Sequence, residues 1–395
     1  MLDLNHVTES QSLSAHPDAR LNLLFSDWSG HMKSIIIPFK EIRKIQENGW
    51  LMDGSAIQGA LRVQETEMKV IPDWKTYRCF SSTQDSLFSS VICQLHLADG
   101  RPYAGDSRAR LHHIQRMLDE RELAIQAACE FSFYYDADNK HESSNLDWLE
   151  NWLSDVRCLS GLSISMQQLS HTHQFLIHLE SAHLLQAADG FALVRHLLMS
   201  RIKERKHFIS LMPLPHNDAR PQKMRLKLRC SGPGLKSHPL LIQKWAQTMV
   251  DHASALSCIC NPTINSFRRL EILRRQRQPY YIVHKEAQEQ ATSIDLYTPD
   301  ALMNPYLTLT ALLATLVPVL DQPTIHKTSN SCTSTIPESL PRSLLEACDA
   351  LSEDEWIADA LGETLFSIWL SHKLEEYQRF EEHIHDWEYQ QYFGS

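Results

Sequence analysis

Histidine pairs are the most conspicuous residues that could bind a metal ion. The chain holds 21 histidines, and two pairs are separated by one residue, His171 with His173 and His383 with His385. Imidazole nitrogens are common zinc ligands, but a site needs further ligands nearby. The first pair lies in an expected strand without a visible third ligand, and the second in an expected acidic, helical tail. Neither pair predicts a metal centre, and no HExxH motif occurs.

Two other groups of residues could do chemistry. Cys258 and Cys260 would share one face of a strand, although such a pair is more often two small buried hydrophobic residues.

The runs 223–229 and 268–277 hold four and five cations. A basic run can bind an anion or nucleic acid, but most are solvated surface or interface, and neither run carries aromatic residues to stack on bases. The net charge of −10 also argues against a nucleic-acid partner.

Composition indicates a folded protein of two domains. The chain has 395 residues, of which 43% are apolar, enough for a sizeable core. Its nine cysteines are scattered without a CxxC pair, which indicates reduced thiols in a cytoplasmic protein. No signal peptide and no stretch of about 18 apolar residues is visible, so a membrane location is not expected.

Hydrophobic periodicity predicts a small α+β module over residues 15–105 and a larger unit over 106–393. In the first unit we expect two strands within 19–40 around a turn at Gly30, a short helix over 39–47 and a strand over 87–97. In the second unit we expect several short strands, a polar loop at 322–338, and long helices. The helices are expected over 108–122, 181–206, 240–258, 305–320 and 340–381, and the strands over 123–135, 172–179, 207–214 and 224–228.

Six stretches in order along the chain resemble glutamine synthetases of the prokaryotic type. They are MDGSAIQG at 52–59, ETEMKVIPD at 65–73, ISLMPLP at 209–215, NPTINSFRRL at 261–270, TPD with NPYL within 298–307, and the segments at 340–344, 361–363 and 387–388. The resemblance implies an α+β fold with an N-terminal β-grasp-like domain (15–105) and a larger α/β catalytic-type domain (106–393). It also implies a homo-oligomeric ring, a hexamer or dodecamer, with active sites between neighbouring subunits.

The family's reaction implies divalent metal ions, because ATP phosphorylates a glutamate side chain before ammonia displaces the phosphate. Oxygen ligands suit such ions, and the resemblance places six ligand positions on this chain. Two keep a carboxylate, Glu130 and Asp295. The partner of Glu130 is Ser132 or Ala128, depending on the alignment. The other three positions hold Gln168, Leu176 and Arg225, the last in place of the family's histidine. We therefore expect no resident metal, with Glu130 and Asp295 as remnants of the metal site.

The resemblance leaves three further remnants of the reaction machinery. Asp53 and Ser55 match the loop on the ammonium side, and Arg269 matches a motif that binds the substrate carboxylate. Asp53 could persist only as part of a turn, and Arg269 only as a surface ion-pair partner. The arginine-rich segment that meets the phosphates is replaced between Gln278 and Ser293 by a shorter connection with two glutamates.

Two functions remain open from the sequence. The first is a catalytically inactive family member that acts as a scaffold or regulator, with a protein partner and no cofactor. The alternative is a divergent ATP-dependent γ-glutamyl–amine ligase of nitrogen metabolism, which would need ATP with Mg²⁺ or Mn²⁺. In that case Lys223, Arg225 and Lys227 could replace part of the metal charge at phosphate oxygens.

Overall fold

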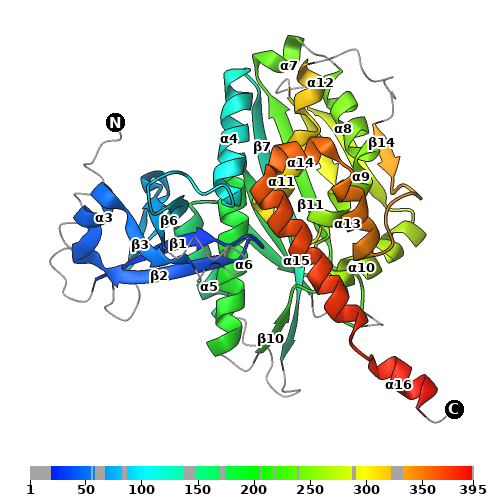
Figure 1. The fold of residues 1–395 in the computed structure, drawn as a ribbon, viewed down its shortest axis with the longest axis horizontal. Helices are drawn as coiled ribbons and strands as arrows, with labels where there is room; N and C mark the ends of the chain where they lie inside the picture. Colours follow the sequence, from blue (N-terminus) through cyan, green and yellow to red (C-terminus); the bar gives the residue numbers. More distant parts are fainter. Residues whose placement is uncertain are drawn as a thin grey trace.

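The structure of the protein is a computed structural model. It describes residues 19–54, 57, 67–81, 87–137, 147–169, 174–204, 207–216, 219–237, 240–286, 291–321 and 332–393. Within them the chain forms two sheets, each with its own hydrophobic cluster, and the smaller unit lies beside the larger one (Figure 1). Ser55 and the pair His171 and His173 lie outside the described residues.

The N-terminal sheet has six strands in the order β2-β1-β6-β4-β3, with β5 paired to β6. The hairpin between the first two strands turns at Gly30, as expected, with φ at +82°. A Cβ at Gly30 would lie 2.8 Å from the Asn304 backbone, so this glycine also permits close contact with the larger unit. The elements are β1 Arg20–Ser26, β2 Met32–Pro38, η1 Phe39–Glu41, α3 Ile42–Asn48, β3 Trp50–Asp53, β4 Glu67–Pro72, η3 Trp74–Thr76, β5 Arg78–Ser81 and β6 Leu87–Leu97.

The larger unit is built on an eight-stranded sheet in the order β14-β12-β13-β11-β7-β9-β8, with β10 paired to β7. Among the described residues, its strands all pair antiparallel. The strands are β7 Ala124–Ala137, β8 Ile164–Gln168, β9 Gln174–His183, β10 His207–Ser210, β11 Met224–Ser231, β12 Pro279–Glu286, β13 Ala291–Leu296 and β14 Thr333–Thr335.

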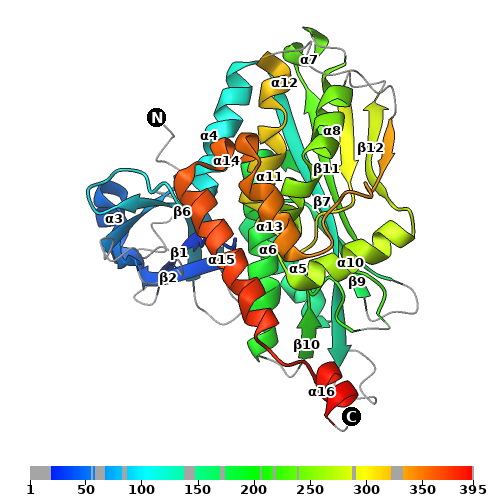
Figure 2. The same ribbon diagram turned by 45° about the vertical axis from the view of Figure 1, so that its right-hand side comes forward.

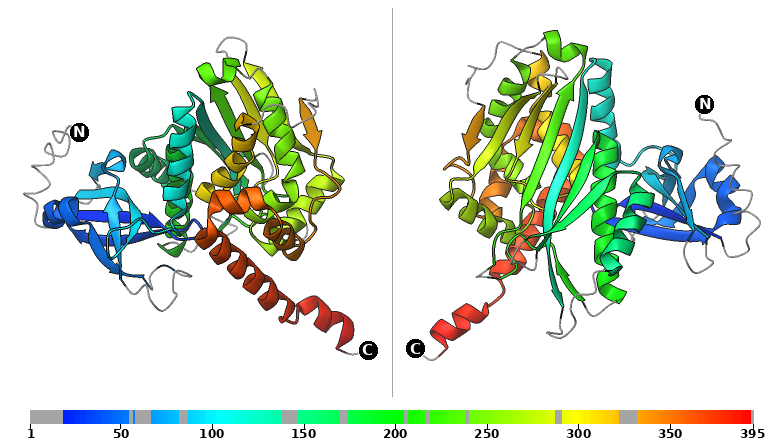
Figure 3. Two further views of the ribbon diagram at one scale, coloured as in Figure 1. Left: turned by 45° about the horizontal axis from the view of Figure 1, so that its top comes forward. Right: turned by 180° about the vertical axis from the view of Figure 1, so that it is seen from behind.

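Helices of the larger unit gather on one side of this sheet (Figure 2). Seen from behind, β7 and β11 lie in front of the helices of the C-terminal half (Figure 3, right). The helices are α4 Ser107–Glu120, α5 Asp147–Ser160, α6 Leu184–Glu204, α7 Pro233–Ser237, α8 Leu241–Asp251, α9 Ala253–Cys260, α10 Ile264–Arg275, α11 Pro305–Ala314, α12 Val317–Asp321, α13 Leu344–Ser352, α14 Glu355–Leu361, α15 Glu363–Glu381 and α16 Asp386–Tyr392.

The side chains of strand β11 alternate between the buried core and the opposite, partly exposed face of the sheet. Met224, Leu226, Leu228 and Cys230 are buried, whereas the alternate residues are partly exposed. Successive side chains of a strand point to opposite faces of the sheet, so the cations of this strand share the other face. These alternate residues are Arg225, Lys227, Arg229 and Ser231.

Several expectations about the elements were wrong in detail. The helix expected over 240–258 is two helices that meet at His252, and Cys258 and Cys260 are buried on the second of them, not on a strand. The expected loop at 322–338 contains strand β14, which pairs with β12. His383 and His385 lie at the break between α15 and α16, not within a helix.

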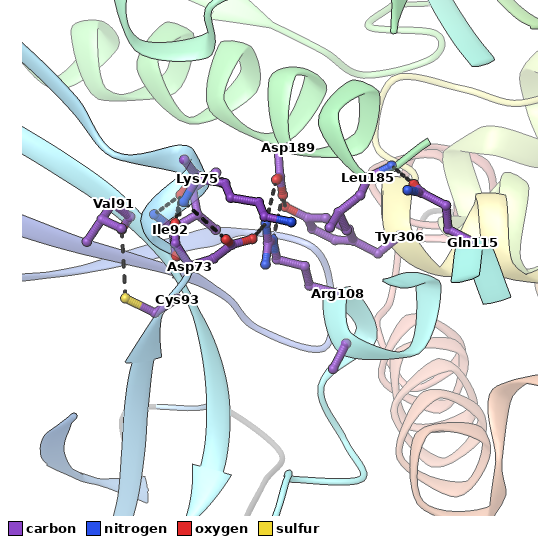
Figure 4. Close-up of polar contacts among 12 residues, drawn as sticks. Asp73, Lys75, Val91, Ile92, Cys93, Arg108, Gln115, Leu185, Asp189 and Tyr306 are labelled. Atoms are coloured by element: carbon purple, nitrogen blue, oxygen red, sulfur yellow. Dashed lines mark hydrogen bonds and ion pairs between the residues drawn. The ribbon is translucent and has the colours of Figure 1, made fainter. Parts of the chain in front are cut away.

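A buried arginine joins the two units. Arg108, near the start of α4, donates from Nε and Nη2 to the Asp189 carboxylate of α6, both at 2.8 Å (Figure 4). Its Nη2 also donates to Asp73 of the N-terminal unit at 2.9 Å. The Tyr306 hydroxyl donates to Asp189 at 2.8 Å. Burial lowers the pKa of Arg108, but Asp189 and its other partners outweigh burial, so the pKa is raised well above its ordinary value.

Candidate functional site

A cavity of about 560 Å³ opens beside strands β7 and β11 and helix α10. Pockets of this size commonly hold small molecules. Residues of three kinds line it: a carboxylate, several cations and a few apolar or amide side chains. Among them are Glu130, Leu176, Arg220, Lys223, Arg225, Arg269 and Tyr297.

Arg225 is the central residue of this cavity. It lies directly opposite Glu130 in the pairing of β11 with β7, so both side chains point to the same face. Its Nη2 donates to Glu130 Oε1, and its Nη1 lies 3.5 Å from Asp295 Oδ2. Burial lowers the pKa of Arg225, and the two carboxylates more than offset this, so the pKa is raised. The guanidinium thus remains charged and bridges the two carboxylates that the sequence singled out.

Two histidines complete the ring of titratable groups around Arg225. His178 lies opposite Glu130 on β9, and its Nδ1 is 3.1 Å from Glu130 Oε1. His284 on β12 places its Nε2 3.4 Å from Asp295 Oδ2. The sequence motifs did not indicate either histidine. The signal that could have identified them is the strand register, which a single sequence does not reveal.

Asp295 is nearly buried, and its other oxygen lacks a partner. Its side chain is only 5% exposed, and Oδ1 has no hydrogen-bond partner among the described residues. The nearby Tyr297 hydroxyl has a raised pKa because of burial and the charge of Asp295, which Arg225 partly offsets. A buried unpaired carboxylate oxygen is costly. The unpaired Oδ1 could accept a hydrogen bond from a donor group of a bound molecule.

The other expected ligand positions carry no charge that could hold a cation. Ser132 is buried and bonded to Gln222 and to the Lys223 backbone N–H, and Ala128 has no polar side chain. Gln168 is exposed at the end of β8, and Leu176 is an apolar part of the cavity wall. Within the described ranges, no cluster of three or more His, Cys, Asp or Glu residues is arranged to hold a metal ion.

Arg269 is buried rather than exposed, so the idea of a surface ion-pair partner was wrong. It is 1% exposed and donates to three backbone carbonyls, those of Gln222 at 2.9 Å, Thr298 at 2.8 Å and Tyr297 at 3.0 Å. Burial lowers its pKa to about 10, which still leaves it charged near neutral pH. Its donors therefore fix the backbone that forms the floor of the cavity.

We expect Arg269→Met to lower the free energy of unfolding by about 2–4 kcal/mol, because three buried carbonyl groups lose their partner. Urea unfolding of the variant checks this value. Arg268→Met is the matched control, because Arg268 is the exposed neighbour in the same helix and its loss should change stability by less than about 0.5 kcal/mol. Equal effects of the two substitutions would contradict a structural role for Arg269.

The structure does not bring Asp53 to this cavity. Asp53 ends strand β3 in the other sheet and is exposed, and it is not among the residues that line the cavity. Within one chain it therefore cannot act on a molecule bound next to Arg225.

Two domain models of one protein family match the chain. A model of the glutamine synthetase catalytic domain matches residues 135–392, and a model of the glutamine synthetase β-grasp domain matches residues 19–98. The chain belongs to the glutamine synthetase family. Its α+β fold is the one that the sequence motifs implied, with a β-grasp domain followed by a larger catalytic-type domain.

Curated glutamine synthetases match the chain along almost its whole length. The enzyme of Thermotoga maritima is 26% identical, over 94% of this chain and 95% of its own length. That of Methanosarcina mazei is 24% identical, over 94% and 93%. Both relatives span the two domains, so the similarity is not confined to one of them.

Solved structures show the same fold at lower identity. A structure described as "Apo GmaS without ligand" matches with a TM-score of 0.79 and 17% identity over 100% of both chains. The glutamine synthetase of Plasmodium falciparum matches with a TM-score of 0.83 and 13% identity over 99% of both. At these identities the likeness establishes the glutamine synthetase fold alone.

No helix that could span a membrane occurs in the portion of the chain that the structure describes.

Proposed function

We propose that this member of the glutamine synthetase family does not ligate ammonia to glutamate, and that it acts as a scaffold or regulator of another protein. One observation carries the proposal: Arg225 is bonded to Glu130 and lies 3.5 Å from Asp295, the two carboxylates that remain at the expected metal positions. The guanidinium occupies the acceptors that a divalent cation would need.

Electrostatic repulsion explains why a divalent metal ion and the Arg225 guanidinium would exclude each other from this site. Two carboxylates and one guanidinium leave a net charge of −1 at the centre of the site, before the other cations of the wall are counted. A divalent ion about 4 Å from a guanidinium would be repelled by roughly 8 kcal/mol at an effective dielectric constant of about 20. Phosphoryl transfer in this family depends on such ions to neutralise the charge of the phosphates. The residues present therefore do not fit the group that the family uses.

We expect no ATP-dependent phosphate release above background when the protein is given glutamate, ammonia or a panel of primary amines, with Mg²⁺ or Mn²⁺. A coupled phosphate assay measures this, and the glutamine synthetase of Thermotoga maritima serves as the positive control. Turnover that disappears in Glu130→Ala would overturn the proposal, because it would show that the remaining carboxylate takes part in catalysis.

The second candidate function is a divergent γ-glutamyl–amine ligase. It is favoured by the open cavity and by two exposed cations on its wall, Arg220 and Lys223, which could contact phosphate oxygens. A structure similar in fold is described as a GmaS/ADP complex, so nucleotide binding occurs elsewhere on this fold. The amine panel distinguishes the two functions, because a ligase would show turnover with at least one amine.

We further propose that the two units divide at residues 105 and 106 and that the protein assembles into a cytoplasmic homo-oligomeric ring. The division is supported by α4, which starts at Ser107 after the last strand of the first sheet. Assembly is supported by helix α16, which projects from the body and exposes aromatic side chains, among them Trp387 (61%) and Phe393 (73%) (Figure 1). Light scattering should report a hexamer or dodecamer; a monomer would contradict the ring.

A further inference from the structure

A second cavity, of about 630 Å³, lies where the two units meet and is separate from the site around Arg225. The N-terminal unit contributes the segment from β4 to β5 and part of β6, and the larger unit contributes one side of α4, the end of α5 and the start of α6. None of its lining residues belongs to the cavity around Arg225. Of the positions that the sequence indicates for metal, ammonium and substrate, those that the structure describes do not line it either.

Arg108 on the wall of this cavity has unused hydrogen-bond donors. Its Nε and Nη2 are engaged by Asp189 and Asp73 (Figure 4). Arg108 is only 1% exposed, and its Nη1 is buried and has no hydrogen-bond partner among the described residues. A buried donor without an acceptor costs free energy, and an acceptor on a molecule in the cavity would recover it.

Further cations line the same cavity. Lys75 is exposed and its side chain extends toward Arg108 (Figure 4). Arg78 also lines the cavity. The pKa of His112, one helical turn after Arg108, is lowered by burial and then by Arg108, Arg116 and Lys75, while only Asp73 among its main neighbours opposes this. Arg108 is shared by Asp73 and Asp189, and Lys75 and Arg78 add two further cations to the lining.

The remaining wall indicates the shape of a ligand. Arg108, His112, Gln115 and Asp119 line the cavity from one face of α4, at a spacing of four, three and four residues. With a rise of 1.5 Å per residue, they cover a distance of about 16 Å. Amide side chains of Gln94, Gln115 and Gln186 offer donors and acceptors without charge, and Asp119 at the far end would repel a second anionic group.

We propose that this junction cavity binds a small metabolite with one anionic head, a phosphate or a carboxylate, and an uncharged hydroxyl-bearing body. The head lies at the end formed by Lys75 and Arg108 Nη1, and the body lies along α4 beside the glutamine side chains. Because the walls come from both units, the ligand would hold the β-grasp domain against the larger domain. This gives the protein a ligand-responsive contact that does not depend on the site around Arg225.

Isothermal titration calorimetry tests the proposal with D-ribose 5-phosphate as the phosphate probe, D-gluconate as the carboxylate probe and D-ribose as the uncharged control. We expect at least one anionic probe to bind and D-ribose not to bind, and the probe that binds identifies the head group. Lys75→Ala should weaken binding about tenfold or more, as for a lost charge-assisted hydrogen bond.

Two matched variants make the result specific. Lys40→Ala removes an exposed lysine of the same domain outside the cavity and should leave binding unchanged. Lys223→Ala removes a cation from the other cavity and should also leave binding unchanged. The proposal is overturned if neither anion binds at millimolar concentration, or if Lys75→Ala has no effect. It is equally overturned if Lys223→Ala, rather than Lys75→Ala, abolishes binding. None of these outcomes depends on whether the protein is a ligase.

Discussion

Arg225→His is expected to bind Mn²⁺ at least tenfold more tightly than the wild-type protein. The substitution removes the guanidinium that bridges Glu130 and Asp295 and supplies the imidazole that the family resemblance places at this position. Removing a repulsion of several kcal/mol and adding a neutral nitrogen ligand both favour the ion. Titration of Mn²⁺ followed by electron paramagnetic resonance measures the free ion directly and gives the dissociation constant.

Lys227→His is the matched control for this experiment. Lys227 lies two residues further along the same face of β11, so the substitution also replaces a cation with a histidine but leaves Arg225 in place. Lys227→His should not bind Mn²⁺ more tightly than the wild type does. The double variant Arg225→His, Glu130→Ala should lose the gain in Mn²⁺ affinity. Equal Mn²⁺ affinity of the wild type and Arg225→His would show that Arg225 does not oppose the metal.

Asp189→Ala is expected to lower the free energy of unfolding by about 3–5 kcal/mol. The substitution removes the carboxylate that accepts two hydrogen bonds from Arg108 and one from Tyr306, and it leaves a buried guanidinium with Asp73 as its remaining charged partner. Breaking a buried ion pair by removing one member costs this much, because the other charge stays desolvated. Thermal and urea unfolding of the variant measure the loss.

An exposed ion pair provides the comparison. Asp321 pairs with Arg121 at 3.0 Å, with side chains that are 54% and 39% exposed, so Asp321→Ala should cost less than about 1 kcal/mol. If Asp189→Ala were as mild as Asp321→Ala, the contact between the two units would not depend on the Arg108 network. Asp189→Asn, which keeps the shape but not the charge, should fall between the two.

Local patterns predicted the elements that depend on neighbouring residues. The hairpin at Gly30, the strand at 87–97 and the strand at 224–228 follow from turn residues and runs of strand-forming residues. The sequence patterns did not predict the breaks within the helical stretches. At His252 the chain passes from α8 to α9 although apolar residues continue on both sides, because tertiary packing decides such boundaries.

Long-range contacts were beyond what one sequence specifies. Arg108 and Asp189 are 81 residues apart and Cys258 and Cys348 are 90 apart, yet each pair is in contact. The proximity of Glu130 to Arg225 was implied only through the family resemblance and now follows from the register of β7 with β11. The burial of Arg269 and the positions of His178 and His284 depend on that same packing, which sequence spacing does not encode.

Crystals soaked with MnCl₂ and ATP, with data collected at a wavelength sensitive to manganese, give the most direct test. If Arg225 replaces the metal, its guanidinium stays between Glu130 and Asp295 and no anomalous peak lies beside them. Two manganese ions seated on these carboxylates with nucleotide attached and Arg225 displaced would contradict this.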